Sequence, residues 1–313
     1  MNIKLIIVAA CLVLPSLTVD AASHRKLVFV NQYDLDGDWS LYADEFDHAR
    51  QKRFNNTDEN QDGVVNEEEY VFEYNNRLDI QLKKDRKAQV QQTIVRFNAL
   101  DKNENDMMEW QEYEASGLRS FTRYDVNEDG NIDIQDPAPV KTWKRKDTSE
   151  LTKQQQEKRR DRQLASAKRS LSMPSTHDKK GMFSKYDNNQ DGIVSRAEHN
   201  QRRRADFDLT DEDNNGWVSQ DEYMFEYQNR MDRQIAKTRL AAIKQTYVRF
   251  AVLDKDENGQ MTIEEYQLSG HRSFNRWDSD KNKIVIMAEA LPEPRKKKKS
   301  QSSNTQVVAV NEY

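Results

Sequence analysis

The chain has 313 residues, of which 33% are charged and 35% are apolar, and 49 Lys and Arg nearly balance 54 Asp and Glu to give a formal net charge of −5. Globular domains usually carry about 45–50% apolar residues, so the apolar core is thin for this length. Cys11 is the only cysteine, which excludes a fold held together by intrachain disulfides.

The first 21 residues predict a secretory signal peptide. A basic start at Lys4, an apolar run over 5–14 and a small-residue exit at Val19 and Ala21 follow the order of such a peptide, with cleavage after Ala21. The run is too short for a membrane span, which needs about 20 residues. We therefore expect a secreted, extracellular chain without a membrane span. Cleavage removes the cysteine, and a bound metal is the obvious remaining source of stability.

Four twelve-residue acidic loops follow, beginning at Asp34, Asp58, Asp101 and Asp125. Each has oxygen-bearing side chains at its first, third, fifth and twelfth positions and an apolar residue at its eighth, which is the spacing of an EF-hand calcium loop. The backbone carbonyl of the seventh residue is the remaining protein ligand. The predicted ligands are Asp34, Asp36, Asp38, Ser40 and Glu45; Asp58, Asn60, Asp62, Val64 and Glu69; Asp101, Asn103, Asn105, Met107 and Glu112; and Asp125, Asn127, Asp129, Asn131 and Asp136.

Three of these residues depart from the ideal loop. The sixth position needs a backbone with positive φ, which favours glycine, but Trp39 and Asp106 stand there in the first and third loops. The fourth loop closes with Asp136, which is shorter than glutamate and is followed by Pro137. A carboxylate that reaches the ion with one oxygen favours Mg²⁺ over Ca²⁺, so the Asp125 loop is a candidate magnesium site.

The second half of the chain repeats the first at an offset of 153 residues, without insertion or deletion. Such a repeat indicates a tandem duplication of a four-loop unit. In the last loop, Lys283 replaces glycine and Ile286 takes the ninth position, and both predict weak binding. The predicted ligands are Asp187, Asn189, Asp191, Ile193 and Glu198; Asp211, Asp213, Asn215, Trp217 and Glu222; Asp254, Asp256, Asn258, Gln260 and Glu265; and Asp278, Asp280, Asn282, Ile284 and Glu289.

These loops resemble those of the EF-hand superfamily, and they cover both halves of the chain. A secreted chain with many such loops and no mature cysteine is similar in style to the reticulocalbin and calumenin family. The resemblance to the EF-hand superfamily implies calcium ligation at the matching positions. The C-terminus, 308–313, is not an ER-retrieval signal, and the loop spacing also differs from that family.

The spacing of the loops predicts an all-α fold of tandem helix–loop–helix units, arranged as two duplicated four-loop domains. Residues 46–57 have room for a single helix joining the first two loops. Residues 70–100 contain no Gly or Pro and form either one long helix or a hairpin of two. We favour the hairpin, because it lets the second loop pair with the third and the first with the fourth.

Two apolar stripes are expected in the core rather than in a ligand groove, and so are the aromatic residues that precede them. The stripes are Val90, Ile94, Phe97 and Leu100, and Ile243, Tyr247, Phe250 and Leu253; the aromatic residues are Tyr70, Phe72, Tyr74, Tyr223, Phe225 and Tyr227.

The segment between the halves and the C-terminal tail are basic. A helix is expected from about Asp147 to Arg169, serving either as a solvated spacer or as a docking strip for acidic partners. The tail after Pro294 is rich in Lys and is expected to be disordered, with polyanion binding or proprotein cleavage as its possible roles. The predicted division is a signal peptide (1–21), a first quartet of loops (22–140), a basic linker (141–176), a second quartet (177–294) and a tail (295–313).

The sequence predicts a secreted calcium-binding protein, acting as an extracellular calcium buffer or matrix component with up to eight loops. The alternatives are a calcium-dependent sensor of the secretory pathway and a protein that bridges acidic or sulfated matrix polymers through the linker and tail. Asn55 begins a glycosylation sequon with Thr57. No nucleophile elbow, phosphate loop or nucleotide fingerprint is present, so we expect neither an enzyme nor a nucleic-acid-binding protein.

Overall fold

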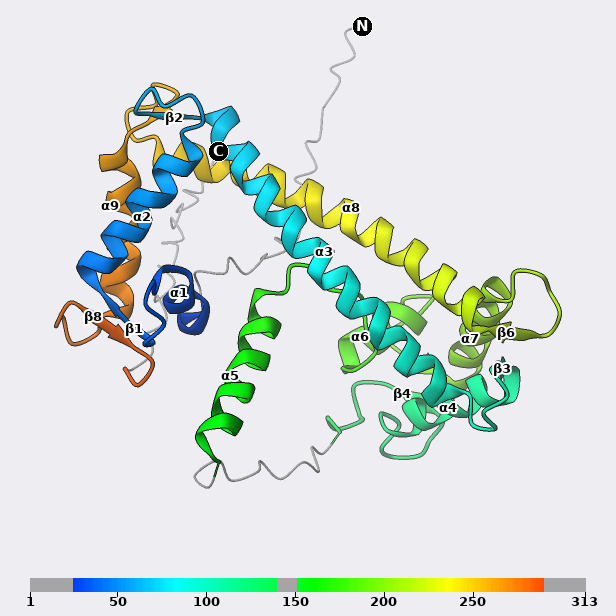
Figure 1. Ribbon diagram of the computed structural model, residues 1–313. Helices are drawn as coiled ribbons and strands as arrows, with labels where there is room; N and C mark the ends of the chain where they lie inside the picture. The colour runs from blue at the N-terminus through cyan, green and yellow to red at the C-terminus, as the bar shows by residue number, and fades with distance from the viewer. Residues whose placement is uncertain (1–24, 140–150, 290–313) are drawn as a thin grey trace, which may run out of the picture.

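The computed structural model describes residues 25–139 and 151–289, and this part of the chain is mostly helical (Figure 1). The all-α class is therefore confirmed. The signal peptide, the tail and the start of the linker lie outside the described residues. The helices are α1 (Lys26–Tyr33), α2 (Ala43–Thr57), α3 (Glu67–Leu100), α4 (Trp110–Thr122), α5 (Lys153–Lys168), α6 (Lys179–Tyr186), α7 (Arg196–Thr210), α8 (Gln220–Leu253) and α9 (Ile263–Trp277). The strands are β1 (Ser40–Tyr42), β2 (Val65–Asn66), β3 (Met107–Glu109), β4 (Asn131–Ile132), β5 (Val194–Ser195), β6 (Trp217–Ser219), β7 (Gln260–Met261) and β8 (Ile284–Ile286).

None of the helices in the described ranges is long and apolar enough to cross a membrane. The helix expected between the first two loops is confirmed as α2.

The short strands pair between the two halves of the chain. The antiparallel pairs are β1 with β8, β2 with β7, β3 with β6 and β4 with β5. The expected pairing of loops within one half is therefore wrong. Each pair matches two residues from the eighth loop positions, all of which are 0–1% exposed: Leu41 with Val285, Val65 with Met261, Met108 with Val218, and Ile132 with Val194.

This pairing builds two lobes, each containing two loops from either half. The first lobe holds the loops that begin at Asp34, Asp58, Asp254 and Asp278. The second lobe holds those that begin at Asp101, Asp125, Asp187 and Asp211. Helices α3 and α8 run between the lobes (Figure 1). The ranges 22–140 and 177–294 are thus sequence repeats that interlock, since every strand pair joins one range to the other.

Helix α3 is continuous over 34 residues, so the hairpin expected over 70–100 is wrong. At about 1.5 Å per residue this helix spans roughly 50 Å. No Gly or Pro interrupts it, and α8 supplies a packing partner along its length. At the centre, Leu78 and Leu82 pack in one apolar cluster with Tyr227, Met231 and Ala242.

Ion pairs flank this central cluster on both sides. Arg86 of α3 pairs with Asp232 of α8 at 3.1 Å, and Arg239 of α8 pairs with Asp79 of α3 at 2.6 Å. The two pairs are equivalent under the 153-residue offset. All four side chains are well exposed, so the ion pairs orient the helices more than they stabilise them.

The buried face of the long helices differs in part from the predicted stripe. Phe97 and Phe250 are buried as expected, but Ile94 is 38% exposed and Tyr247 is 44% exposed. Thr93 and Thr246 are buried instead. Each threonine hydroxyl donates 2.8 Å to the carbonyl four residues earlier, which satisfies its hydrogen-bonding need inside the core. The contact line of the two antiparallel helices thus runs one residue away from the apolar periodicity.

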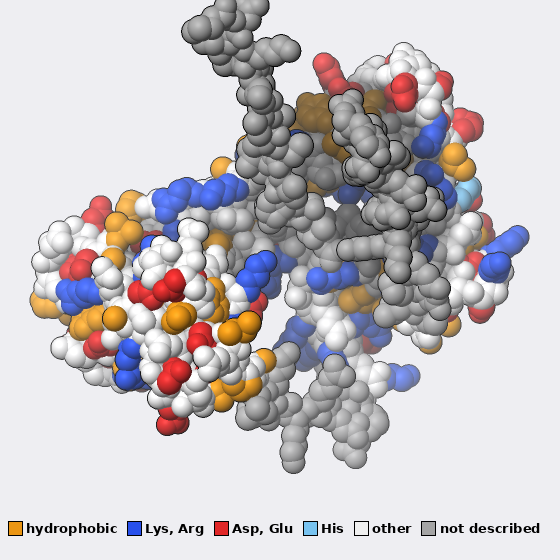
Figure 2. All heavy atoms as spheres, turned by 180° about the vertical axis from the view of Figure 1, so that it is seen from behind, with side chains coloured by type: hydrophobic (Ala, Val, Ile, Leu, Met, Phe, Trp, Pro, Cys, Tyr) orange, Lys and Arg blue, Asp and Glu red, His pale blue; other side chains and the backbone are white. Residues whose placement is uncertain are grey.

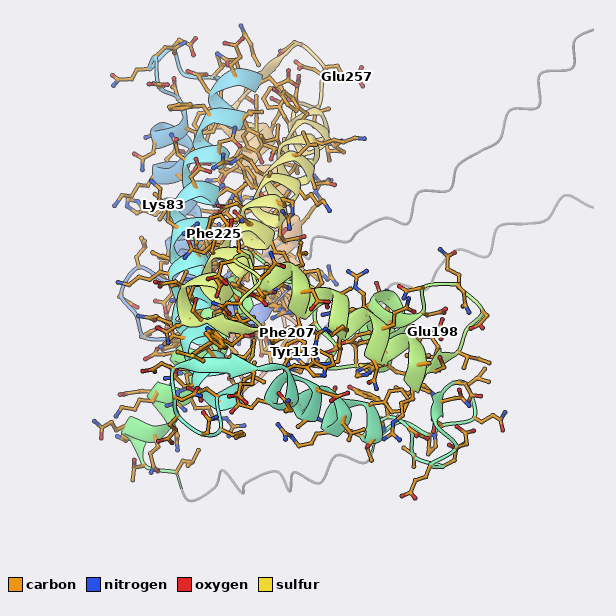
Figure 3. All side chains as sticks on the ribbon, turned by 90° about the vertical axis from the view of Figure 1, so that its right-hand side faces the viewer. Lys83, Tyr113, Glu198, Phe207, Phe225 and Glu257 are labelled. Atoms are coloured by element: carbon orange, nitrogen blue, oxygen red, sulfur yellow. The ribbon has the colours of Figure 1, made fainter. Side chains whose placement is uncertain are left out.

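The aromatic residues expected in the core divide in the same way. Tyr227 is 3% exposed, and the ring of Tyr70 contacts that of Phe250 at a tilt, with centroids 5.8 Å apart. Phe72 and Phe225 are each 55% exposed, so their expected burial is wrong; Phe225 is labelled in Figure 3.

The linker combines a solvated helix with a buried anchor. Helix α5 begins at Lys153, with Thr152 as its N-cap; the helix start expected at Asp147–Glu150 lies outside the described residues. Beyond α5, the backbone N–H groups of Ser170 and Leu171 donate to Asp85 of α3 at 2.7 and 2.9 Å. Leu171 is fully buried in the cluster between α3 and α8. The linker is therefore part of the core where it meets the long helices.

A buried arginine crosses a helix in each lobe. Arg50 of α2 donates to the carbonyl of Tyr266 and to Gln267 (3.2 Å), and its guanidinium lies 3.7 Å from the Tyr266 ring centroid. The side chain passes directly over Gly270, where an added Cβ would lie 2.2 Å from Arg50 Nε. Arg203 crosses Gly117 in the same manner in the second lobe. Both glycines are required by this close approach.

We predict that Gly270→Ala destabilises the protein by about 1–3 kcal/mol, because the new methyl group displaces an anchored arginine. In a helix where nothing lies over the glycine, the same change stabilises by up to about 1 kcal/mol. The sign of the change in unfolding free energy therefore tests whether Arg50 lies over Gly270. The measurement is urea denaturation of Gly270→Ala in the parent and in an Arg50→Ala background. In the Arg50→Ala background the change becomes stabilising; destabilisation of equal size in both backgrounds would contradict the crossing.

His199 occupies in the second lobe the place that Phe46 takes in the first. Its ring lies 4.4 Å from the Tyr186 ring and 5.2 Å from Phe121, by centroids, and it is 1% exposed. Its Nε2 atom is buried without a hydrogen-bond partner among the described residues. Burial lowers the pKa of His199 to about 4 from its ordinary value of 6.5, so the folded lobe holds this imidazole neutral.

We predict that His199→Phe stabilises the protein and removes one source of acid sensitivity. Because the pKa of His199 is lower in the folded state, its protonation favours the unfolded chain, and stability falls as pH drops from 6.5 towards about 4. The measurement is urea denaturation of parent and variant across this range. Both proteins share the same carboxylates, so the difference between them isolates the histidine. Parallel pH profiles would refute the assignment.

Candidate metal centres

All eight loops share one backbone geometry. In each, the fourth and sixth residues have φ between 57° and 91°. Trp39, Asp106 and Lys283 take this left-handed conformation at φ 68°, 61° and 68°, as their alignment predicts. A non-glycine residue in this region costs roughly 1–2 kcal/mol, so these three positions are less favourable than glycine would be.

Backbone N–H groups orient the side chains of each loop, as the Asp58 loop illustrates. Asp58 accepts from the N–H of Asp62 (3.2 Å) and of Gly63 (3.0 Å). Glu69 accepts through one oxygen from the N–H of Asn60 (3.3 Å) and through the other from Asn66 (2.9 Å). The first and last carboxylates of the loop are thereby aimed at a common centre.

The closing carboxylate is held in the same way in the other loops. One carboxylate oxygen can accept from the N–H of the second or third loop residue, and the other can accept from the N–H of the ninth. Most of these loops have both bonds, and the others have one of them. These residues are Glu45, Glu112, Asp136, Glu198, Glu222, Glu265 and Glu289. Asp136 makes the same set of bonds as the glutamates with a shorter side chain.

Four loops bring three carboxylates within 4.8 Å of one another. The clusters are Asp34, Asp36 and Glu45; Asp211, Asp213 and Glu222; Asp254, Asp256 and Glu265; and Asp278, Asp280 and Glu289. These are the four loops with aspartate at the third position. The other four have asparagine there, which keeps the oxygen ligand and lowers the charge. Three carboxylates this close repel one another unless a cation lies between them.

Some ligand oxygens have no hydrogen-bond partner among the described residues although they are buried. They are one carboxylate oxygen each of Glu45, Asp125 and Asp187. A buried carboxylate oxygen without a partner costs free energy, and a bound cation would remove that cost. The donor sets consist of oxygens, which suit Ca²⁺ or Mg²⁺ rather than a transition metal that prefers nitrogen or sulfur. The residues present therefore fit a hard divalent ion.

Hydrogen bonding lowers the pKa of three closing carboxylates. Burial acts to raise the pKa of Glu222 and of Glu265, but N–H and hydroxyl donors, first from Ser219 and Thr262, hold both values below the ordinary range. Burial also acts to raise the pKa of Asp136, but hydrogen bonds from the N–H groups of Asp133, Val126 and Asn127 lower it below its ordinary value. These groups are ionised at neutral pH, as metal ligands must be.

The ninth loop residue starts the exit helix in most loops. Asn66 accepts 3.0 Å from the N–H of Glu69 and forms a capping box with it. Ser195, Ser219 and Thr262 cap the same way. Asn66 therefore acts directly as the N-cap of α3.

The loops beginning at Asp34 and Asp278 have no capping side chain at the ninth position. These two loops pair with each other through β1 and β8. Their ninth residues are Tyr42 and Ile286, and their sixth are Trp39 and Lys283. The two poorest loops thus form one pair. The Asp58 loop pairs instead with the Asp254 loop, in which every expected ligand type is present.

Sequence reasoning missed two lysines that complete the last loop of each half. Lys179 donates to the carbonyls of Asp133 and Asp136, and Lys26 donates to those of Ile286 (3.1 Å) and Glu289 (2.9 Å). Both loops run into the described ends of their halves without an exit helix. The signal that reveals these lysines is the 153-residue offset between them.

Two wider features complete the site description. Figure 2 shows acidic side chains over both lobes, interspersed with basic ones, rather than gathered in one patch. Asn55 is exposed on α2, where its side-chain carbonyl accepts 2.8 Å from Gln51; its glycosylation stays a prediction. Searches of protein-family models, curated proteins and solved structures find no match to this chain.

We predict that Glu69→Gln lowers calcium affinity at the Asp58 loop by about tenfold or more, since even groups that only support a ligand change metal affinity about 10–100-fold. Asn66→Ala has a smaller effect on affinity and costs about 1 kcal/mol of stability through the lost N-cap. The Gly63 amide, which donates to Asp58, reports this loop alone by NMR during a calcium titration. The amides of Gly192 and Gly216 serve as internal controls. Equal affinity of Glu69→Gln and parent would contradict the loop register.

Proposed function

We propose that the protein is a secreted calcium-binding protein whose eight loops are EF-hand sites, coupled in pairs across the two halves. One observation carries the proposal: four loops each bring three ionisable carboxylates within 4.8 Å. Ordinary Asp-rich and Asn-rich turns need one side-chain oxygen to accept from the backbone. Three convergent carboxylates exceed that need, and the loop geometry that aims them recurs eight times.

A calcium buffer or matrix component fits the described surface better than a sensor. Sensor proteins of this kind expose a methionine-rich groove on binding calcium. Here Met108, Met182, Met231 and Met261 are each at most 1% exposed. Two lie at the β pairs themselves, so exposing them would require breaking the pairing. We assign the protein no catalytic role, and magnesium remains the candidate ion for the Asp125 loop.

Calcium is also proposed as a source of folding energy. The chain is poor in apolar residues, and the carboxylates within each loop repel one another when no cation is bound. Each site filled at 100 times its dissociation constant adds about 2.7 kcal/mol of stability. Calcium binding would also stabilise the contact between the two halves, because each strand pair joins a loop of one half to a loop of the other.

We predict that residues 22–313 bind six to eight calcium ions, with the weakest sites in the paired Asp34 and Asp278 loops, and that calcium raises the melting temperature. Isothermal titration calorimetry gives the stoichiometry, and differential scanning calorimetry with calcium or with chelator gives the shift. Sodium chloride at matched ionic strength separates site binding from charge screening. Saturation at two ions or fewer, or equal melting with calcium and with chelator, would overturn the proposal.

A further inference from the structure

Helix α5 contacts the first lobe along one side only. None of its residues is buried, and Figure 1 shows its N-terminal end directed away from α3 and α8. Its side-chain contacts to the body involve Arg160, whose guanidinium lies 4.5 Å from the Trp39 ring centroid, and Lys168, which donates to Asn31 of α1. An isolated helix of this length is marginal in water, so these contacts hold it in place.

The two faces of α5 differ in charge. Arg160, Leu164 and Lys168 follow the helical period on the side that meets α1 and Trp39. The opposite side carries Lys158, Arg159 and Arg162 and, at the C-cap, Arg169, all exposed. The acidic residues of the helix, Glu157 and Asp161, fall outside that side by the same period. We call Lys158, Arg159, Arg162 and Arg169 the basic stripe.

The basic stripe has no acidic partner in the described structure. None of the ion pairs found among residues 25–139 and 151–289 includes a residue of α5. Positive charge is crowded further at its C-terminal end, where burial and the nearby Lys84 of α3 both lower the pKa of Lys168. Lys83, next to it in the sequence, is exposed on α3 (Figure 3). Basic side chains therefore cluster on this side of α5 without an ion-pair partner among the described residues.

We propose that the basic stripe binds a linear sulfated polysaccharide. From Lys158 to Arg169 the stripe is about 16 Å long at 1.5 Å per residue, which matches an extended chain carrying several charged groups better than a single small anion. Guanidinium groups pair with sulfate or carboxylate through two parallel hydrogen bonds, and three of the four cations are arginines. Short runs rich in Lys and Arg are a known form of polysaccharide-binding surface.

The chemistry of the stripe favours this class over the other polyanions. Binding of single-stranded nucleic acid relies on aromatic side chains that stack on the bases, and the stripe contains none. A protein partner would need a buried apolar or aromatic anchor at the centre of the interface, and the residues between the cations, Gln163, Ala165 and Ser166, provide none. A flexible, densely charged chain needs only the charges that are present.

The proposal goes beyond calcium binding and does not depend on it. The Asp34 loop lies beside α5 through Trp39, so calcium in that loop would lower the negative charge near the stripe. Sulfate groups bridged by calcium would bind at the loops instead. A comparison of charge variants at one fixed calcium concentration separates the stripe from such bridging, because the loops are unchanged in every variant.

The experiment measures binding of residues 22–313 to a sulfated heparin-type octasaccharide by calorimetry. The test variant replaces the stripe with glutamine: Lys158→Gln, Arg159→Gln, Arg162→Gln and Arg169→Gln. The control removes the same charge at exposed lysines of α2, α6 and α8: Lys52→Gln, Lys180→Gln, Lys237→Gln and Lys244→Gln. One exposed ion pair changes an equilibrium constant by about 1.4- to 5-fold, so the loss of four pairs weakens binding of the test variant by about fourfold or more, and the control changes far less.

Added salt weakens the parent complex, because exposed charges are screened. Glutamine keeps helix propensity close to that of Lys and Arg, and circular dichroism checks that α5 and the lobes persist. Equal losses in the test and control variants would show that net charge alone acts and would overturn the proposal. Stripe-dependent binding that prefers a polyglutamate peptide or a single-stranded oligonucleotide of equal charge would overturn the choice of polysaccharide. Failure of calcium binding in the earlier titration would leave this result unaffected.

Discussion

The pairing of short strands between the halves is the constraint on which the structure depends. A strand of two or three residues has no stability by itself, so each loop needs its partner to fix the apolar residue at its eighth position. Since every partner lies in the other half, neither half completes a pair within itself. The long helices follow from this, because each half must place two loops in either lobe, and only an uninterrupted α3 or α8 spans that distance.

The same loops hold the opposing force. Carboxylates brought within 4.8 Å repel one another in proportion to how well the backbone orients them, so good ligand geometry is unfavourable in the absence of a cation. The thin apolar core has little free energy to offset this. Five buried clusters, several of only four to six buried residues, are distributed along the molecule instead of forming one large core. Calcium would act on every lobe at once, because the loops lie beside these clusters.

Much of the local structure could be predicted from the sequence, and the pairing could not. Loop register, the left-handed sixth residue and the joining helix α2 follow from spacing and residue type, which act over a few neighbours. The choice between pairing inside a half and between halves depends on whether 70–100 bends, and no residue in it signals a turn. A hairpin over 70–100 predicts that each loop pairs within its own half, whereas every loop pairs with one of the other half. Thr93 and Thr246, polar residues in a buried face, were hidden for a related reason, since only the partner helix defines that face.

The linker breaks the repeat symmetry, and its path is longer than connection requires. It joins the Asp125 loop to α6, and both belong to the second lobe, where β4 and β5 already pair. The chain nevertheless reaches the first lobe, where Lys168 contacts Asn31, and then crosses the middle of the molecule at Asp85. The residue equivalent to Asp85 in α8 is Thr238, which lacks a carboxylate to accept the N–H groups of Ser170 and Leu171, so this anchor exists once. A direct connection would have kept α5 beside the second lobe. The contacts with Asn31 and Asp85 instead hold this basic helix against the first lobe.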